Sequence, residues 1–292
     1  MSASVDTSVA EAPSTKRPKP WVWLREALVI AIVYIVYGFV RNQFGSARLH
    51  PGDEPLHAFN NAVRIIDLEK ALGLFHEQTI QRWFLGTGWV TFFNLFYGTA
   101  HFIVTLGVLI WLFVRHSERF GRWRTMLMAT TVLALIGFAL FPLMPPRLFN
   151  AIPSVSRYGG GQLAIEHHQP NYGFVDTLRD GNGLWSFDSA KMDRLSNQYA
   201  AMPSLHIGWS LWCAIVIAVF ARRKWVRYLA FLYPLLTLVA IVATANHYII
   251  DAAGGIAIVG TGFLIALGVE HLRRKRLPSV GDELSDDVLV PH

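Results

Sequence analysis

The chain has 292 residues, of which 53% are hydrophobic and 16% are charged, and its mean hydropathy is +0.35. These values exclude an ordinary water-soluble enzyme, an intrinsically disordered chain and a coiled coil, and the single cysteine, Cys213, excludes a disulfide scaffold. The net charge of +6 requires no nucleic-acid partner, because basic residues at the inner ends of membrane spans account for it. We therefore expect an all-α polytopic membrane helical bundle.

Six apolar segments of roughly 20 residues follow one another along the chain, the length that crosses a hydrocarbon core about 30 Å thick. The predicted transmembrane helices are residues 23–44, 90–114, 125–141, 205–220, 226–245 and 249–269. The first segment is too long, and too poor in a small-residue cleavage site, for a removed signal peptide. We interpret it as a retained anchor.

No soluble domain is predicted. Residues 21–277 form one six-span membrane domain, whereas residues 1–20 and 278–292 are polar and aperiodic. Segments of that composition bury too little apolar surface to fold, so both are predicted to be disordered tails.

Basic residues orient the bundle, because Lys and Arg stay on the cytoplasmic side during insertion. Sixteen of the 26 basic residues lie at every second connection: Lys16, Arg17, Lys19, Arg25; Arg115, Arg119, Arg122, Arg124; Arg222, Arg223, Lys224, Arg227; Arg273, Arg274, Lys275 and Arg276. Both termini are therefore predicted to be cytoplasmic. The loops 45–88 and 145–203 and the turn near Asn246 are predicted to face the outside of a plasma (inner) membrane.

The two long outer loops differ in character. In the first loop Leu56, Phe59, Val63 and Ile66 recur at steps of three or four residues, which predicts an amphipathic helix lying in the membrane interface. The second loop is polar and glycine-rich. It is long enough to form a lid or a headgroup pocket, and long loops of this kind are more often functional than idle.

Four ionisable residues from different spans are predicted to meet at the outer interface. Arg147 follows the third span, His206 opens the fourth, His247 closes the fifth and Asp251 begins the sixth. The basic loops alone define this topology, so the coincidence of all four at one level is an independent observation. Ionisable groups inside a membrane bundle usually have a function, so this coincidence favours a functional site.

The local sequence around these residues suggests their chemistry. Pro203 can start a helix and Ser204 can cap it, which leaves a positive helix end suited to a phosphate. Asp251 lies four residues after His247, so its carboxylate can accept one ring N–H and leave a nitrogen lone pair as a nucleophile. His206 can donate a proton to a leaving alkoxide, and Arg147 can bind two phosphoryl oxygens.

These residues resemble the motifs of the type 2 phosphatidic acid phosphatase superfamily, which are Lys-x6-Arg-Pro, Pro-Ser-Gly-His and Ser-Arg-x5-His-x3-Asp. Pro203-Ser204-Leu205-His206 matches the second motif except for Leu205, and His247-x3-Asp251 matches the end of the third. The chain departs from the pattern where it has Leu140 for the lysine, Leu148 for the proline and Ala240-Ile241 for Ser-Arg. Of the phosphate-binding cations in the motifs of that superfamily, Arg147 is the one that this sequence retains.

The Pro-Ser-Leu-His form, the glycines at 254 and 255 and the Pro-Pro before Arg147 are closer to the inositol phosphorylceramide synthase branch. The resemblance covers about residues 90–270. It implies a lipid phosphotransferase with His247 as nucleophile, Asp251 as its orienting partner and His206 as general acid, while Arg147 and Ser204 bind phosphate. It also implies a phospholipid substrate, an alcohol or water as acceptor, and no metal or organic cofactor.

Three alternatives remain beside this interpretation. Taken singly, each histidine more often serves as an interhelical hydrogen-bond partner. His206, His247 and Asp251 together are also a ligand set for zinc, and a proton-coupled transporter is the non-enzymatic alternative.

In the second span Tyr97 and His101 share a helical face with Asn94. We predict Tyr97 and His101 to contact the substrate headgroup. The pair His167-His168 is interpreted as exposed loop residues. The oligomeric state is not predicted.

Overall fold

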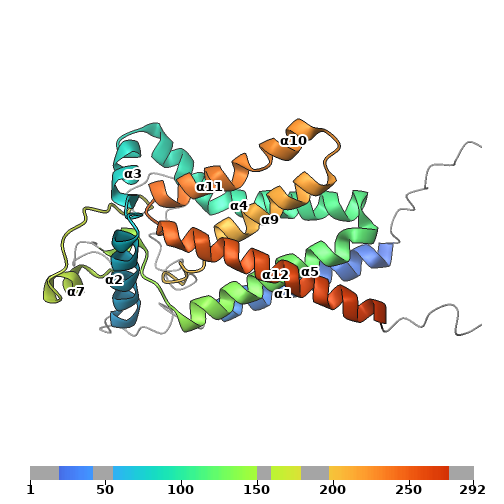
Figure 1. Cartoon of the computed structure of the whole chain (residues 1–292), viewed down its shortest axis with the longest axis horizontal. Coiled ribbons are helices and arrows are strands. Elements are labelled where there is room, and N and C mark those ends of the chain that lie inside the picture. Colours follow the sequence, from blue (N-terminus) through green and yellow to red (C-terminus); the bar gives the residue numbers. More distant parts are fainter. Residues whose placement is uncertain (1–19, 42–54, 150–158, 179–196, 276–292) are drawn as a thin grey trace, which may run out of the picture.

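The computed structural model describes residues 20–41, 55–149, 159–178 and 197–275, and the regular elements in these ranges are helices (Figure 1). Most of both predicted tails lies outside them. In chain order the helices are α1 (Pro20–Arg41), α2 (Leu56–Ala71), α3 (Glu77–Phe84), α4 (Gly88–Arg115), α5 (Ser117–Leu140), α6 (Pro146–Phe149), α7 (Gly161–Glu166), α9 (Leu205–Phe220), α10 (Lys224–Leu229), α11 (Leu232–Ala243) and α12 (Ile249–Lys275).

Four of the described helical segments are long and apolar enough to cross a membrane: α4, α5, the stretch Lys224–Ala243 formed by α10 and α11, and α12. They confirm the predicted helical class and supply four candidate membrane spans among the described residues. The apolar helix α9 has 16 residues and is shorter than these spans, and α1 covers most of the predicted first span. The count of six spans and the cytoplasmic position of the termini stay predictions.

The helix that contains the predicted third span is longer than that span. Helix α5 begins at Ser117, directly after a one-residue connection at His116, and not near residue 125. Arg119, Arg122 and Arg124 therefore lie on the helix itself. The helix can begin early because two of these cations are paired: Arg122 with Glu270 of α12 and Arg124 with Glu26 of α1.

A second difference lies in the fifth span, which is broken into α10 and α11. Pro234 lies in the first turn of α11, where its missing N–H has no intrahelical acceptor to lose. In the first outer loop the predicted amphipathic helix is confirmed as α2, which buries Phe59 and Ile66, and its location in the membrane interface stays a prediction. The short helix α3 after it was not predicted.

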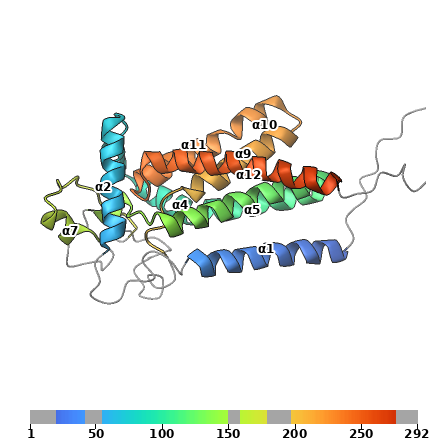
Figure 2. The same ribbon diagram turned by 60° about the horizontal axis from the view of Figure 1, so that its bottom comes forward.

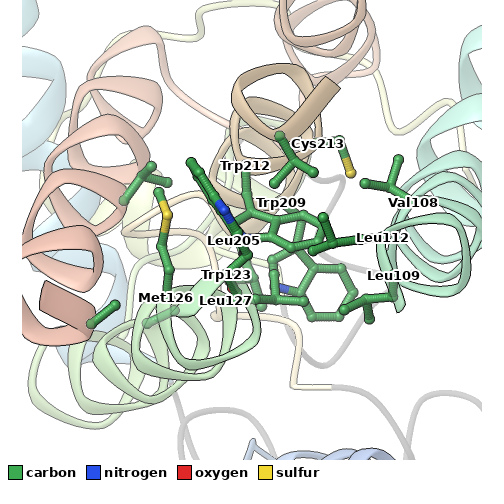
Figure 3. Packing of buried hydrophobic residues seen from close by; sticks show 14 of the residues in the cluster. Val108, Leu109, Leu112, Trp123, Met126, Leu127, Leu205, Trp209, Trp212 and Cys213 are labelled. Carbon is green, nitrogen blue, oxygen red and sulfur yellow. Dashed lines mark hydrogen bonds between the residues drawn. The ribbon is translucent and has the colours of Figure 1, made fainter. Parts of the chain in front are cut away.

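The core of the bundle forms where α4, α5, α9 and α12 meet (Figure 3). Trp212 of α9 is completely buried, and its indole N–H donates to the carbonyl oxygen of Trp123 at 3.0 Å. The indole of Trp209 donates to the hydroxyl of Thr131 at 3.0 Å. Helix α12 approaches α5 closely at Gly262, where a Cβ atom would lie 2.5 Å from the Thr130 hydroxyl. Small residues permit such contacts between membrane helices.

One end of the bundle is covered by the outer-loop elements. Helix α2 runs across this end, roughly at right angles to the long helices, and α3 and α7 lie beside it (Figures 1 and 2). The turn between α4 and α5, α10 and the last turn of α12 lie at the opposite end. The basic clusters on these three segments therefore share one end of the molecule, as the predicted topology requires.

Candidate active site

The N-terminus of α9 is tied to the start of α12. Ser204 is the N-cap residue of α9, and its hydroxyl oxygen accepts the N–H of Ile207 at 3.5 Å. The predicted cap is confirmed, although Pro203 lies before the cap and not inside the helix. The backbone N–H of Ser204 donates to the carbonyl oxygen of Asp251 at 3.0 Å. Gly255 permits this contact, since a Cβ atom there would lie 2.6 Å from the Ser204 carbonyl oxygen.

The turn between α11 and α12 holds His247. Its ring Nδ1 lies 3.1 Å from Oδ2 of Asp251, and the backbone N–H of Tyr248 donates to the same oxygen at 3.0 Å. Asp251 is completely buried and His247 is 2% exposed. The predicted contact is confirmed, although His247 precedes the first residue of α12. With the carboxylate as acceptor, Nδ1 bears the proton and Nε2 of the neutral ring keeps its lone pair.

His206, in the first turn of α9, lies next to that lone pair. Its Nδ1 is 3.4 Å from Nε2 of His247, and the ring centroids are 5.4 Å apart. Two side chains of α4 flank the His206 ring: Tyr97 stacks on it and His101 meets it edge-on, each with centroids 4.4 Å away. The structure therefore brings five of the predicted residues, these four and Asp251, into one group.

Arg147, on α6, contacts the same turn. Its backbone N–H donates to the carbonyl oxygen of Ala245 at 2.8 Å. Its guanidinium donates to Asn246 and to Asp176, both at 2.9 Å, and to the amide oxygen of Gln198. These contacts use three of its five N–H donors, and the other two have no partner among the described residues. The same contacts also place the Arg147 guanidinium beside Asn246, the residue that precedes His247.

Asp176, Gln198 and Asn246 were missed by the sequence interpretation. Asn246 adjoins His247, and this adjacency was the one available signal. Its amide group donates to the Thr244 hydroxyl at 2.8 Å while its oxygen accepts from Arg147. Asp176 and Gln198 lie in irregular chain without a motif, and they reach Arg147 only through the fold.

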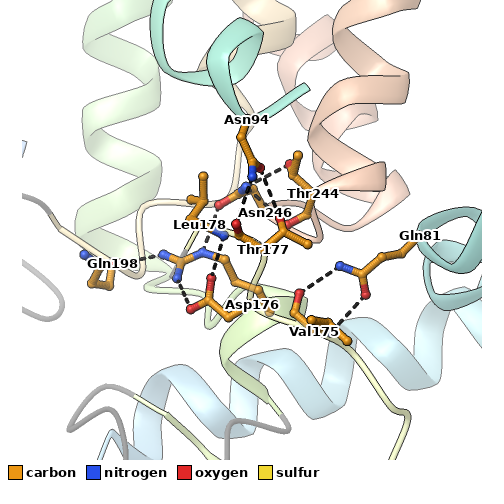
Figure 4. A network of polar contacts seen from close by, with 10 residues as sticks. Gln81, Asn94, Val175, Asp176, Thr177, Leu178, Gln198, Thr244 and Asn246 are labelled. Carbon is orange, nitrogen blue, oxygen red and sulfur yellow. Dashed lines mark hydrogen bonds and ion pairs between the residues drawn. The ribbon is translucent and has the colours of Figure 1, made fainter. Parts of the chain in front are cut away.

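Residues 175–177 of the second outer loop are held by hydrogen bonds to α3 and α4 (Figure 4). Gln81 of α3 makes two hydrogen bonds to the backbone of Val175, at 2.8 and 3.0 Å. Asn94 of α4 makes two to Thr177, at 2.8 and 3.0 Å. The remaining parts of this loop, 150–158 and 179–196, lie outside the described residues. His167 and His168 are exposed, as predicted.

The zinc alternative would need the donor atoms of His206, His247 and Asp251 to converge on one point. In the described ranges no three His, Cys, Asp or Glu side chains are arranged around such a point. The donor atoms of these three residues face one another in series instead, because Nδ1 of His247 points to Asp251 and Nε2 points to His206. This order suits proton and phosphoryl transfer.

Comparison with known proteins identifies a family for this chain. A family model described as the PAP2 superfamily matches residues 63–265. The matched range contains all seven predicted site residues. No curated protein and no solved structure matches the chain.

Proposed function

The chain belongs to the PAP2 superfamily, and we propose that it is an integral membrane lipid phosphotransferase that works through a phosphohistidine on His247. The observation that carries this proposal is the hydrogen-bonded series from Asp251 through His247 to His206. It provides an oriented nucleophile with a proton donor beside it. The proposed acceptor is an alcohol, as in the inositol phosphorylceramide synthase branch, and the proposed side of the membrane is extracytoplasmic.

In the first step Nε2 of His247 attacks the phosphorus atom of the donor lipid. A P–N bond forms, the P–O bond to the leaving group breaks, and His206 gives its proton to the departing oxygen. The His247 ring becomes positively charged, and the buried carboxylate of Asp251 stabilises that charge through Nδ1–H. Since His206 lies in contact with Nε2 before substrate binds, its ring must move aside to admit the phosphoryl group.

In the second step His206 accepts a proton from the acceptor, whose oxygen then attacks phosphorus while the P–N bond breaks. An alcohol acceptor yields a new phosphodiester or phosphomonoester. Water as acceptor would make the same site a lipid phosphate phosphatase, which is the alternative function. The acceptor that reaches phosphorus decides between the two, because both reactions use the same side chains.

Arg147 is proposed to bind two phosphoryl oxygens with the N–H groups that remain after its contacts to Asn246, Asp176 and Gln198. We expect Arg147→Lys to lower kcat/KM about 100-fold, because an ammonium group cannot replace a planar guanidinium in this arrangement. Steady-state kinetics on the purified variant measure the effect. Arg64→Lys, at an exposed position of α2, is the matched control. An unchanged kcat/KM in Arg147→Lys would remove Arg147 from the site.

An apolar cavity supports a lipid as substrate. It has a volume of about 640 Å³ and lies between α1, α4, α5 and α9. Trp209, which lines it, also contacts the His101 ring, with centroids 5.8 Å apart. Along α4 its lining extends from Phe102 to Phe113. At 1.5 Å per residue this is about 16 Å, or half of a hydrocarbon core. We propose that a hydrocarbon chain of the donor lipid lies there.

Filling this cavity should therefore lower kcat/KM for long-chain lipids more than for short-chain lipids. We expect Leu106→Trp, at a residue that lines it, to lower kcat/KM about 10-fold for a long-chain lipid. A displaced chain shifts the phosphoryl group, and shifts of about 1 Å are costly. A short-chain, water-soluble analogue should be turned over normally.

The matched control is Ile103→Trp, which places the same side chain on an exposed face of α4 outside the cavity lining. Equal losses for short and long chains in Leu106→Trp would contradict the proposed location of the lipid chain.

The proposed function is tested with purified protein in detergent containing EDTA. Radiolabelled phospholipids with different headgroups are added with and without candidate alcohols, and the reaction is stopped by rapid quench at alkaline pH, which preserves phosphohistidine. We expect label on the wild-type protein and none on His247→Ala. A phosphorylated alcohol as product identifies a transferase, and free phosphate identifies the phosphatase. Absence of both label and turnover would favour the transporter, and activity that returns only with zinc would favour a metal site.

A further inference from the structure

Two glutamates of the first outer loop meet at the start of α12. Glu69 lies near the end of α2, Glu77 is the first residue of α3, and both side chains are completely buried. Oε1 of Glu69 accepts the backbone N–H of Ile250 at 2.7 Å, and Oε1 of Glu77 accepts that of Ile249 at 2.9 Å. The first N–H groups of a helix have no intrahelical acceptor. The two carboxyl groups therefore cap α12 from two other helices.

The second oxygen of each carboxyl group is also buried. Oε2 of Glu69 and Oε2 of Glu77 receive no hydrogen bond from other groups in the described part of the chain, and the two carboxyl groups interact with each other. Two ionised carboxylates in contact inside a protein repel strongly, whereas one shared proton gives a carboxyl–carboxylate hydrogen bond. One proton on the pair satisfies both remaining oxygens.

The surroundings of the pair keep that proton bound. The pKa of Glu69 is raised to about 9, mainly by burial and then by the adjacent Glu77 and the charge of Asp251, against the lowering effect of the Ile250 N–H. The nearby cations are bonded elsewhere, Lys70 to the Tyr172 hydroxyl and Arg147 to Asp176. The titratable groups that interact with the pair from the packed elements are Asp251 of α12 and Tyr248 of the preceding turn.

We propose that Glu69 and Glu77 are positioning residues that share one proton, and that this pair fixes the first turn of α12 so that Asp251 orients His247. The inference rests on the proposed function of His247. Ile249 and Ile250, which the pair holds, lie between His247 and Asp251 in the sequence. When the shared proton is lost at alkaline pH, the charges of Glu69 and Glu77 repel each other, and this repulsion displaces the two side chains from their contacts with the first turn of α12. The geometry of His247 and Asp251 is then lost as well.

Glu69→Gln tests this directly, because its amide can accept the Ile250 N–H and donate to Glu77 without a titrating proton. We expect kcat within about twofold of wild type at pH 7. Wild-type kcat should fall as the pH rises through about 9, and this alkaline decrease should disappear in Glu69→Gln. Glu69→Ala leaves both the Ile250 N–H and Glu77 without a partner, and its kcat should fall about 100-fold with little change in KM. The exposed Asp67→Asn on the same helix is the matched control.

The stability of the folded state should depend on pH, because the pKa of Glu69 differs between the folded and the unfolded chain. The folded chain holds the proton up to about pH 9, whereas an exposed glutamate releases it near 4.5. The pair therefore makes the folded state less stable as pH rises from about 4.5 to about 9, and the loss ends above that range. The melting temperature of Glu69→Gln minus that of wild type should therefore increase as the pH rises from about 4.5 to about 9.

Infrared spectroscopy supplies a measurement that does not depend on activity. The carbonyl stretch of a protonated carboxyl group should be present in wild type at pH 7, disappear on titration above about 9, and be absent from Glu69→Gln. A wild-type spectrum without that band, or an alkaline decrease in kcat that persists in Glu69→Gln, would overturn the proposal. If the band behaves as expected but no phospholipid is turned over, the shared proton is supported and the proposed function has failed instead.

Discussion

His247→Ala is expected to lower kcat by about 10⁵-fold or more, because the variant has no nitrogen that can form the covalent intermediate. The His206 ring cannot replace it, because the carboxylate of Asp251 is placed to orient the ring of His247. Rapid-quench assays with labelled phospholipid measure both turnover and label retained on the protein. We expect neither in the variant.

The matched control for this variant is His57→Ala, an exposed histidine on α2 at the same end of the molecule. It should keep wild-type turnover and labelling. Gel filtration in detergent and circular dichroism establish that both variants are folded. Near-normal activity in folded His247→Ala would exclude the phosphohistidine mechanism.

Asp251→Asn is expected to lower kcat about 1,000-fold with a much smaller change in KM. Oδ2 of Asp251 accepts two N–H groups, from His247 and from the Tyr248 backbone. The amide oxygen of asparagine should occupy that position, because an NH2 group there would face two donors. The tautomer of His247 is then kept, but the negative charge that stabilises the phosphorylated ring is lost.

The NH2 group of the introduced asparagine would occupy the place of Oδ1 of Asp251, which is buried and has no hydrogen-bond partner in the described residues. Some loss of stability is therefore expected as well. Measuring kcat on protein that is still folded separates the two effects, and Asp67→Asn again provides an exposed control. A kcat within tenfold of wild type would mean that the charge of Asp251 does not act on the reaction.

Contacts between residues close in the sequence could be predicted from the sequence. The four-residue spacing of His247 and Asp251 indicates their hydrogen bond, and Ser204 before an apolar run indicates the cap of α9. Runs of apolar residues likewise identify the long helices, because both helix periodicity and the length of a membrane span are local properties. The third span was predicted from residue 125 because cations normally lie outside the hydrocarbon core, whereas the helix itself starts at Ser117, with Arg122 and Arg124 paired with carboxylates on other helices.

The amino-acid sequence alone thus establishes the helical membrane class and the two short motifs that carry the chemistry. Folding in three dimensions was needed to place His206 against His247, 41 residues away, Arg147 against Asn246, 99 residues away, and Glu69 against Ile250, 181 residues away. These contacts depend on how α2, α6, α9 and α12 pack against one another. Helix packing follows from the shapes of whole helix faces and from close approaches at glycines such as Gly255, which no spacing within a single segment encodes.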